Sequence, residues 1–160
     1  MIGLQRWVET LVRGRRTAIV GVGSRLRGDD GAGPAVVERL AGSRACVIDA
    51  GTVPENYLGV LAQAAPEVVL FVDSLDHGAA PGACGVAPPA ALGSRGADTH
   101  APSLRLLTGL LESAGSECWL LGIQPARCDL GEGLSPEVAA AVDALAGALA
   151  AALSPEVCHA

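Results

Sequence analysis

The sequence is poor in aromatic residues and in positive charge. Aromatic side chains make up 2% of its 160 residues while hydrophobic residues make up 50%, so Ala, Val and Leu must fill most of the interior. Lysine and arginine together number 11 against 17 aspartates and glutamates, which leaves a net charge of −6. Because nucleic-acid binding relies on a surplus of basic residues, this balance argues against DNA or RNA as a partner.

Cysteine pairs and long apolar runs are also missing. The five cysteines form no C-x-x-C pair, which supports neither a disulfide framework nor a structural zinc site. Residues 1–12 lack the uninterrupted apolar core of about 7–15 residues that a signal peptide needs. The stretch Val138–Leu153 is interrupted by Asp143 and is shorter than the roughly 18 residues of a membrane span. We therefore expect a cytoplasmic protein without membrane insertion.

Short apolar runs alternate with helical patterns along the chain. Continuous runs rich in Val, Ile and Leu are typical of strands buried on both faces of a parallel sheet. The predicted strands are Thr17–Val22, Ala45–Asp49, Val68–Asp73 and Cys118–Gly122, with a fifth at Cys84–Ala87. The predicted helices are Pro34–Leu40, Tyr57–Ala64, Pro102–Ser113 and one that begins at Ser135-Pro136-Glu137. This alternation predicts an α/β fold, a three-layer sandwich whose mostly parallel twisted sheet of about five strands has helices on both faces.

Two segments remain outside these elements. The basic cluster Arg13–Arg16, with Arg6 upstream, is interpreted as the solvated face of a turn-rich segment, with a docking patch as the alternative. The segment 88–101 is rich in Pro, Gly, Ala and Ser and is predicted to be a long surface loop, a kind of segment that is often functional. No repeat or linker divides the sequence, so we expect a single domain over residues 1–160.

A glycine-rich turn with two adjacent carboxylates joins the first strand to its helix. Residues Gly21–Gly33 read GVGSRLRGDDGAG, and a strand, a glycine-rich turn and a helix in this order are typical of a phosphate cradle. However, Asp29 and Asp30 stand where a phosphate loop carries lysine and serine, and the third glycine of a G-x-G-x-x-G motif would fall at Leu26. The two carboxylates would repel a phosphate and attract a cation. The turn therefore favours a metal over a nucleotide.

Further polar residues follow the other predicted strands. Ligand sites in open α/β sheets lie beyond the carboxyl ends of the strands. The residues that reach this edge are Asp49, Asp73, Ser74, Asp76 and His77, and the long loop adds His100. Asp30, Asp73 and His100 together suit a divalent transition metal, since imidazole favours Zn, Ni, Cu or Fe over Mg or Ca.

Each of these residues also has a purely structural interpretation. Asp29 and Asp30 are suited to the N-cap or the first turn of the following helix. Asp73 suits a turn after its strand, and a single histidine such as His77 or His100 more often anchors a loop than binds a metal. Only the combination of carboxylates and imidazole indicates a metal site.

Five segments in order resemble the hydrogenase maturation endopeptidases. They are Gly21-x-Gly23 through Gly28-Asp-Asp-Gly-x-Gly33, Asp49-Ala-Gly-Thr-Val-Pro-Glu-Asn56, Phe71-Val-Asp-Ser74, Thr99-His100 and Leu121-Gly-Ile-Gln-Pro125. The resemblance covers residues 17–153 and is closest to the branch that processes the large subunit of formate-hydrogenlyase-type nickel-iron hydrogenases. One departure is Ser24, where the family usually has Asn, and this difference concerns the geometry of the loop more than the metal ligands.

The resemblance implies an endopeptidase that removes the C-terminal extension of a hydrogenase large-subunit precursor once nickel has been inserted. It implies that Asp30, Asp73 and His100 contact nickel, which the precursor supplies, and that the free site accepts other divalent metals such as zinc or cadmium. Asp30 and Asp73 are then the catalytic candidates, in an aspartic-type or metal-assisted mechanism, and Asp29 is a third candidate. We expect the protein to act as a monomer.

Three other functions are weighed against this one. A non-catalytic nickel-binding chaperone for the same precursor is the main alternative, because no nucleophile is evident. A nucleotide-binding enzyme is disfavoured by the adjacent pair Asp29 and Asp30. Serine or cysteine catalysis is disfavoured because no G-x-S-x-G elbow is present and no cysteine is predicted to face the Asp30, Asp73 and His100 group.

Overall fold

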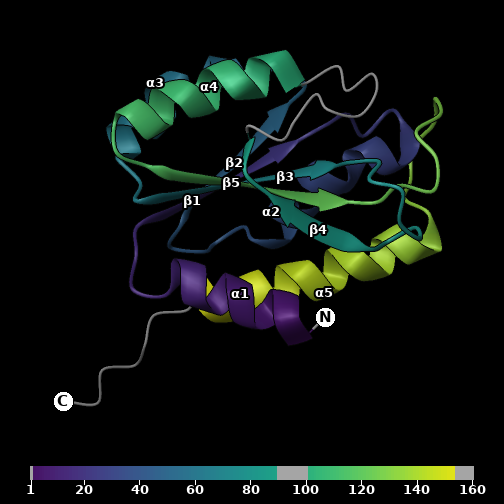
Figure 1. Cartoon of the computed structure of the whole chain (residues 1–160). Helices are drawn as coiled ribbons and strands as arrows, with labels where there is room; N and C mark the ends of the chain where they lie inside the picture. The colour runs from purple at the N-terminus through teal and green to yellow at the C-terminus, as the bar shows by residue number, and fades with distance from the viewer. Residues whose placement is uncertain (1, 90–100, 154–160) are drawn as a thin grey trace.

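A five-stranded sheet forms the centre of the molecule in the computed structural model, which describes residues 2–89 and 101–153 (Figure 1). The strands are β1 (Thr17–Val22), β2 (Cys46–Gly51), β3 (Val68–Ser74), β4 (Cys84–Ala87) and β5 (Glu117–Ile123). The helices are α1 (Ile2–Val12), α2 (Ala32–Arg39), α3 (Leu58–Ala64), α4 (Ala101–Ser113) and α5 (Pro136–Leu153), with short 3-10 turns η1 (Gly28–Gly31) and η2 (Pro54–Tyr57).

The sheet is mostly parallel, as the alternation of strands and helices predicts. Its strand order is β2-β1-β3-β5-β4. Strand β1 pairs in parallel with β2 and β3, and β3 pairs in parallel with β5. Strand β4 lies at the edge and runs antiparallel to β5. Because four strands are parallel, their carboxyl ends and the loops that follow them meet at one edge of the sheet.

Helices cover both faces of the sheet and create two separate cores. One core joins α1, α2 and α5 to one face, and the other joins α3 and α4 to the opposite face (Figure 1). Successive residues of β1 enter opposite cores: Ile19 packs with the first, and its neighbours Ala18 and Val20 pack with the second. Since both faces are buried, the central strands need continuous apolar runs. The predicted α/β class and its three layers are confirmed.

The N-terminal segment contains a helix that was not predicted, while Arg13–Arg16 lie in the turn that follows it, in agreement with their interpretation as part of a turn-rich segment. Residues Ile2–Val12 form α1, which buries Val8, Leu11 and Val12 in the core that it shares with α2 and α5. The ring of Trp7 meets that of Trp119 on β5 edge to face, with centroids 5.5 Å apart. The spacing of these apolar residues is helical.

Helix α5 is 18 residues long with a mean hydropathy of 1.5, so by length and composition it is capable of crossing a membrane. The apolar stretch was expected to be too short for this, but the helix begins two residues earlier, at Pro136. One face of α5, including Val142, Leu145 and Leu149, packs into the same core as α1 and α2. The fold therefore uses α5 as a core helix.

Gly33, in the first turn of α2, sits where the helix crosses β1 and β3 most closely. A Cβ at this position would lie 2.5 Å from the carbonyl oxygen of Val22 and still closer to that of Val72. Both obstacles are backbone atoms of the sheet and cannot move aside as a side chain would.

We expect Gly33→Ala to lower the free energy of unfolding by about 1–3 kcal/mol, measured by urea denaturation. Gly147→Ala in α5 is the control, because a Cβ there meets nothing within 4 Å and should stabilise the helix slightly. Equal stability of both variants would contradict the close packing of Gly33.

Candidate active site

The carboxyl edge of the sheet brings Asp30 close to the end of β3. The hydroxyl of Ser74 donates a hydrogen bond to Oδ1 of Asp30 at 3.2 Å, and the backbone N–H of Ser24 donates to Oδ2 at 2.8 Å. Asp73 precedes Ser74 in β3 and is 2% exposed, whereas Asp30 is only partly buried. A partly exposed carboxylate, Asp30, and a buried one, Asp73, thus lie at the same edge of the sheet, and Ser74 links Asp30 to the end of β3.

The turn that carries Asp30 is tightly wound. Gly23 has a φ of 134°, and a Cβ there would collide with the backbone carbonyl oxygen of Asp30. This close approach lets the following residue, Ser24, donate its backbone N–H to the Asp30 carboxylate. Because Ser24 uses its main chain for this bond, the bond itself does not depend on the side chain at this position, so the departure from asparagine noted in the sequence does not remove it. The Ser24 hydroxyl oxygen accepts the N–H of Leu26 at 3.3 Å.

Asp29 is fully buried and is held by hydrogen bonds from a different part of the chain. Its Oδ2 accepts the backbone N–H groups of Ala126 and Arg127 at 2.8 and 3.1 Å and the hydroxyl of Ser135 at 2.9 Å. Its Oδ1 accepts the N–H of Ser135 at 2.7 Å. Neither Asp29 nor Asp30 caps a helix, since neither η1 nor α2 has a side-chain cap hydrogen bond, but both lie in the first turn of η1, which leads into α2. Asp29 instead ties the turn to the loop that leads into α5.

The electrostatics of Asp29 reflect this anchoring. Burial by itself raises the pKa of a carboxyl group, but the hydrogen bonds from Ser135, Arg127 and Ala126 outweigh it and hold the pKa of Asp29 below its ordinary value. The group is therefore ionised at neutral pH. The ionised carboxylate accepts hydrogen bonds from N–H groups of the 126–135 loop and is buried away from solvent.

Cys128 lies beside the two site carboxylates, and the prediction that no cysteine faces this group is wrong. Burial raises the pKa of its thiol, the charges of Asp30, Asp29 and Asp73 raise it further, and a hydrogen bond with Ser74 opposes them. The thiol therefore stays protonated at neutral pH, which disfavours it as a nucleophile. The sequence carried no signal for this placement, because Cys128 reaches the site only through the anchoring of Arg127 to Asp29.

The other polar residues of this edge have structural partners. Oδ2 of Asp49 lies 3.2 Å from the Arg25 guanidinium, and its Oδ1 accepts the N–H of Gly51 at 3.2 Å. The ring of His77 lies against Gly85 of β4. His100 falls in the segment 90–100, outside the described residues, as does most of the predicted loop 88–101.

Gln124 is a residue of this edge whose contacts the sequence did not reveal. It is 6% exposed, and its Oε1 accepts the backbone N–H groups of His77 and Ala79 at 2.8 and 3.2 Å. Its Nε2 donates to Oδ1 of Asp76 at 3.1 Å. The side chain therefore holds the loop after β3 in place. The segment Gly122-Ile-Gln-Pro125 was a signal that this position matters, but its partners lie about 47 residues away in the chain.

Among the described residues, few side chains at this site are of a kind that could bind a metal ion. In the part of the chain that the structure describes, no group of three or more His, Cys, Asp or Glu side chains is arranged to hold a metal ion. Asp30 and Asp73 both lie near Cys128 at this edge of the sheet, and two carboxylates neutralise a dication while leaving coordination positions open.

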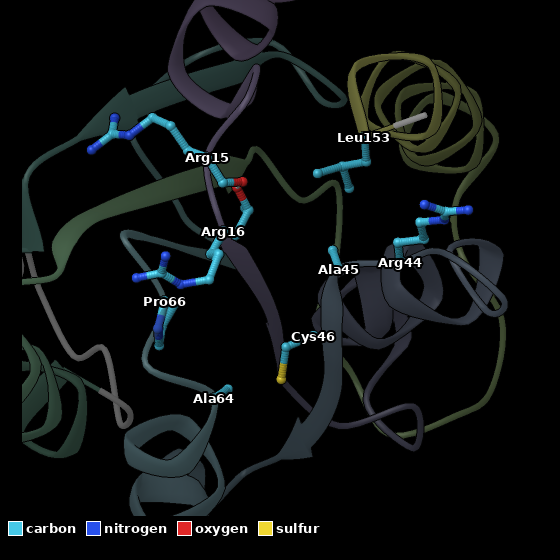
Figure 2. A pocket seen from close by; sticks show the side chains of 9 residues that line it. Arg15, Arg16, Arg44, Ala45, Cys46, Ala64, Pro66 and Leu153 are labelled. Carbon is cyan, nitrogen blue, oxygen red and sulfur yellow. The ribbon is translucent and has the colours of Figure 1, made fainter. Parts of the chain in front are cut away.

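A recess lined by basic residues lies at the opposite edge of the sheet, where the parallel strands begin. It has a volume of about 390 Å³ and is lined by Arg15, Arg16 and Arg44, among others. In Figure 2 the guanidinium group of Arg44 lies on the opposite side of the view from those of Arg15 and Arg16. Arg15 forms an ion pair with Glu117 at 2.8 Å, and Arg16 donates to the carbonyl oxygen of Ala65 at 3.2 Å. The arginines therefore do not converge on a single anion, and the docking patch considered for this cluster gains no support from their geometry.

Comparison with known proteins points to one family. The family described as hydrogenase maturation protease matches residues 34–152 of the chain. The hydrogenase 3 maturation protease of Escherichia coli (strain K12) is 35% identical over 108 residues, which cover 65% of this chain and 69% of that protein.

Solved structures show the same fold. The crystal structure of a [NiFe] hydrogenase maturation protease, HycI, from Thermococcus kodakarensis KOD1 superposes with a TM-score of 0.83 at 31% identity, covering 92% of this chain and 98% of that one. The solution structure of an endopeptidase, HycI, from Escherichia coli superposes with a TM-score of 0.75 at 27% identity, covering 84% of this chain and 89% of that one.

Proposed function

The chain belongs to the hydrogenase maturation protease family and is a peptidase of hydrogenase maturation, and on that premise we propose how its site works. Its substrate is the large-subunit precursor of a [NiFe] hydrogenase, from which it removes the C-terminal extension. The nickel ion arrives in the precursor and is contacted by Asp30, Asp73 and His100. The pairing of Asp30 with the end of β3 is the observation that supports this assignment most directly.

The two carboxylates have different roles in this proposal. Asp73 is buried and contributes negative charge below the surface of the site. Asp30 is more exposed, and the hydroxyl of Ser74 and the N–H of Ser24 fix the orientation of its carboxylate. Asp30 is therefore the better placed of the two to take a proton from an attacking water. Nickel, when present, supplies Lewis acidity that polarises the scissile carbonyl group.

Asp29 does not act as the base. Its two oxygens accept four hydrogen bonds and are shielded from solvent, so no oxygen remains for a water molecule in the site. An aspartic-type mechanism, in which carboxylates alone activate the water, remains the alternative to metal assistance. The two mechanisms differ in whether cleavage requires nickel.

We predict that cleavage depends on nickel in the precursor. Two carboxylates that face one site repel each other until a cation arrives, so the nickel-free precursor should dock poorly and lack electrophilic assistance. We expect nickel-loaded precursor to be processed at least about 100-fold faster than nickel-free precursor. The test is to incubate each form with the protein and to measure the mass of its C-terminal region over time. Equal cleavage of both forms would favour the aspartic-type mechanism, and no cleavage of either would favour the chaperone.

A further inference from the structure

Two loops at the carboxyl edge of the sheet are joined by backbone hydrogen bonds. The N–H of Gly131 donates to the carbonyl oxygen of Leu26 at 2.8 Å, and the N–H of Gly28 donates to the carbonyl oxygen of Gly131 at 2.8 Å. Arg27 and Gly131 form an isolated parallel bridge. The turn that carries Asp30 and the loop that follows β5 therefore form one unit.

Each of these loops exposes a leucine next to the bonds that join them. Leu26 is 59% exposed and Leu130 is 87% exposed. Isolated apolar residues on a surface are common and need no explanation. Here, however, the two leucines belong to adjacent backbone segments, and Leu26 is four residues from Asp30. Their position beside the site makes them candidates for contact with a molecule that binds there.

A pocket of about 340 Å³ lies against the same two loops. Gly28, Gly31, Ala35 and Leu134 form much of its wall. Gly28 and Gly31 also begin and end η1, the turn that contains Asp30. The pocket and the candidate active site therefore share one segment of chain, η1.

The charges around this pocket favour an apolar occupant. Arg25 lines it, but its guanidinium lies 2.9 Å from Glu38 and 3.2 Å from Asp49, so its positive charge is already neutralised. Glu132 also lines the pocket, and the carboxylates of the site lie nearby. An acidic segment would be repelled here. Glycine, alanine and leucine walls with two adjacent leucines instead suit apolar side chains.

The surface is also held in place before any partner binds. Asp29 accepts the backbone N–H groups of Ala126 and Arg127, and its own N–H donates to the carbonyl oxygen of Arg127 at 3.0 Å. This anchoring fixes the start of the loop that carries Leu130. A pre-ordered apolar surface costs less conformational entropy on binding than a loop that must fold onto its partner.

We propose that Leu26, Leu130 and the adjacent pocket form a docking surface for apolar side chains of the hydrogenase precursor beside its cleaved bond. This inference rests on the proposed function, because the occupant is identified by the continuity of the surface with the candidate active site. It assigns to these residues the binding of the polypeptide, while Asp30, Asp73 and His100 act on the metal and the scissile bond.

The test compares two double variants. Leu26→Ser with Leu130→Ser removes the surface, and Leu106→Ser with Leu110→Ser is the matched control, since these leucines are 64% and 47% exposed on α4, which covers a face of the sheet. We expect the first variant to raise KM for nickel-loaded precursor about tenfold, with kcat within twofold and an unchanged melting temperature. The control should match the wild type, and Leu26→Met with Leu130→Met should restore most of the affinity.

Each other outcome is informative. An unchanged KM in the Leu26 and Leu130 variant, while the wild type cleaves normally, would overturn the docking surface and leave the proposed function standing. If the wild type binds the precursor without cleaving it, the proposed function fails, and the dissociation constants of the same variants still test the surface. Sedimentation of the protein alone should show no self-association that the leucine substitutions abolish, and such self-association would instead assign the surface to a second copy of the chain.

Discussion

Asp30→Asn should process nickel-loaded precursor at least about 100-fold more slowly than the wild type while keeping its fold. The asparagine carbonyl oxygen can still accept the N–H of Ser24, and its amide can donate to the hydroxyl of Ser74, which accepts as well as donates. The substitution therefore preserves the local geometry and removes only the negative charge and the basic oxygen. The measurement is the initial rate of processing, followed by the mass of the precursor.

The control for this variant is Asp143→Asn, which removes a carboxylate from α5 that pairs with Arg39 at 2.7 Å. Its processing rate should equal that of the wild type. His100→Ala in the same assay tests the imidazole that the family resemblance assigns to the metal. A wild-type rate in Asp30→Asn would remove Asp30 from both the metal-assisted and the aspartic-type mechanism.

Asp29→Asn should instead destabilise the whole fold, by about 3–5 kcal/mol in free energy of unfolding. Three of the four partners of this carboxylate are backbone N–H groups, which can only donate, and both oxygens face at least one of them. Whichever way the asparagine amide turns, its NH₂ group faces a donor. Adjacent aspartates are thus predicted to respond to the same substitution in different ways. Urea denaturation measures the effect, and a stability within about 0.5 kcal/mol of the wild type would refute the anchoring role of Asp29.

The same variant should change how stability depends on pH. Because the folded-state pKa of Asp29 lies below its ordinary value of 3.8, folding favours the ionised form of this group. Its contribution to stability is therefore fully present above that ordinary value and is lost as the pH falls through the lower folded-state value. Unfolding free energies measured between pH 7 and roughly pH 3 should fall less steeply for Asp29→Asn than for the wild type.

Sequence patterns anticipated the sheet well because the central strands are buried on both faces. Strands β1 and β3 are buried along almost their whole length and are mostly apolar, and such runs are recognisable without knowing their neighbours. Helix α1 shows the limit of this reasoning: its apolar residues have helical spacing, but no local feature says that they pack against α5 and β5.

The candidate site was predictable only in part. Asp30 follows β1 and Asp73 lies near the end of β3, and the rule that parallel strands end at one edge places both residues at that edge from the sequence alone. The roles of Asp29 and Asp30 were not separable in this way, since both are aspartates in the same turn. Their difference depends on the loop 126–135, about 100 residues further along the chain, which donates its N–H groups to Asp29 and leaves Asp30 to face Ser24 and Ser74.

The sequence by itself determined the α/β class, the edge of the sheet at which the polar residues gather, and the family. These features depend on hydrophobic periodicity and on motifs that are local in the chain. Only the tertiary structure decided which carboxylate is an anchor, that Cys128 joins the site, and that Leu26 and Leu130 lie on neighbouring loops. The physical reason is that hydrogen bonds, burial and charge interactions act over a few ångströms in space. Residues that are distant in the chain acquire such neighbours only when the chain folds.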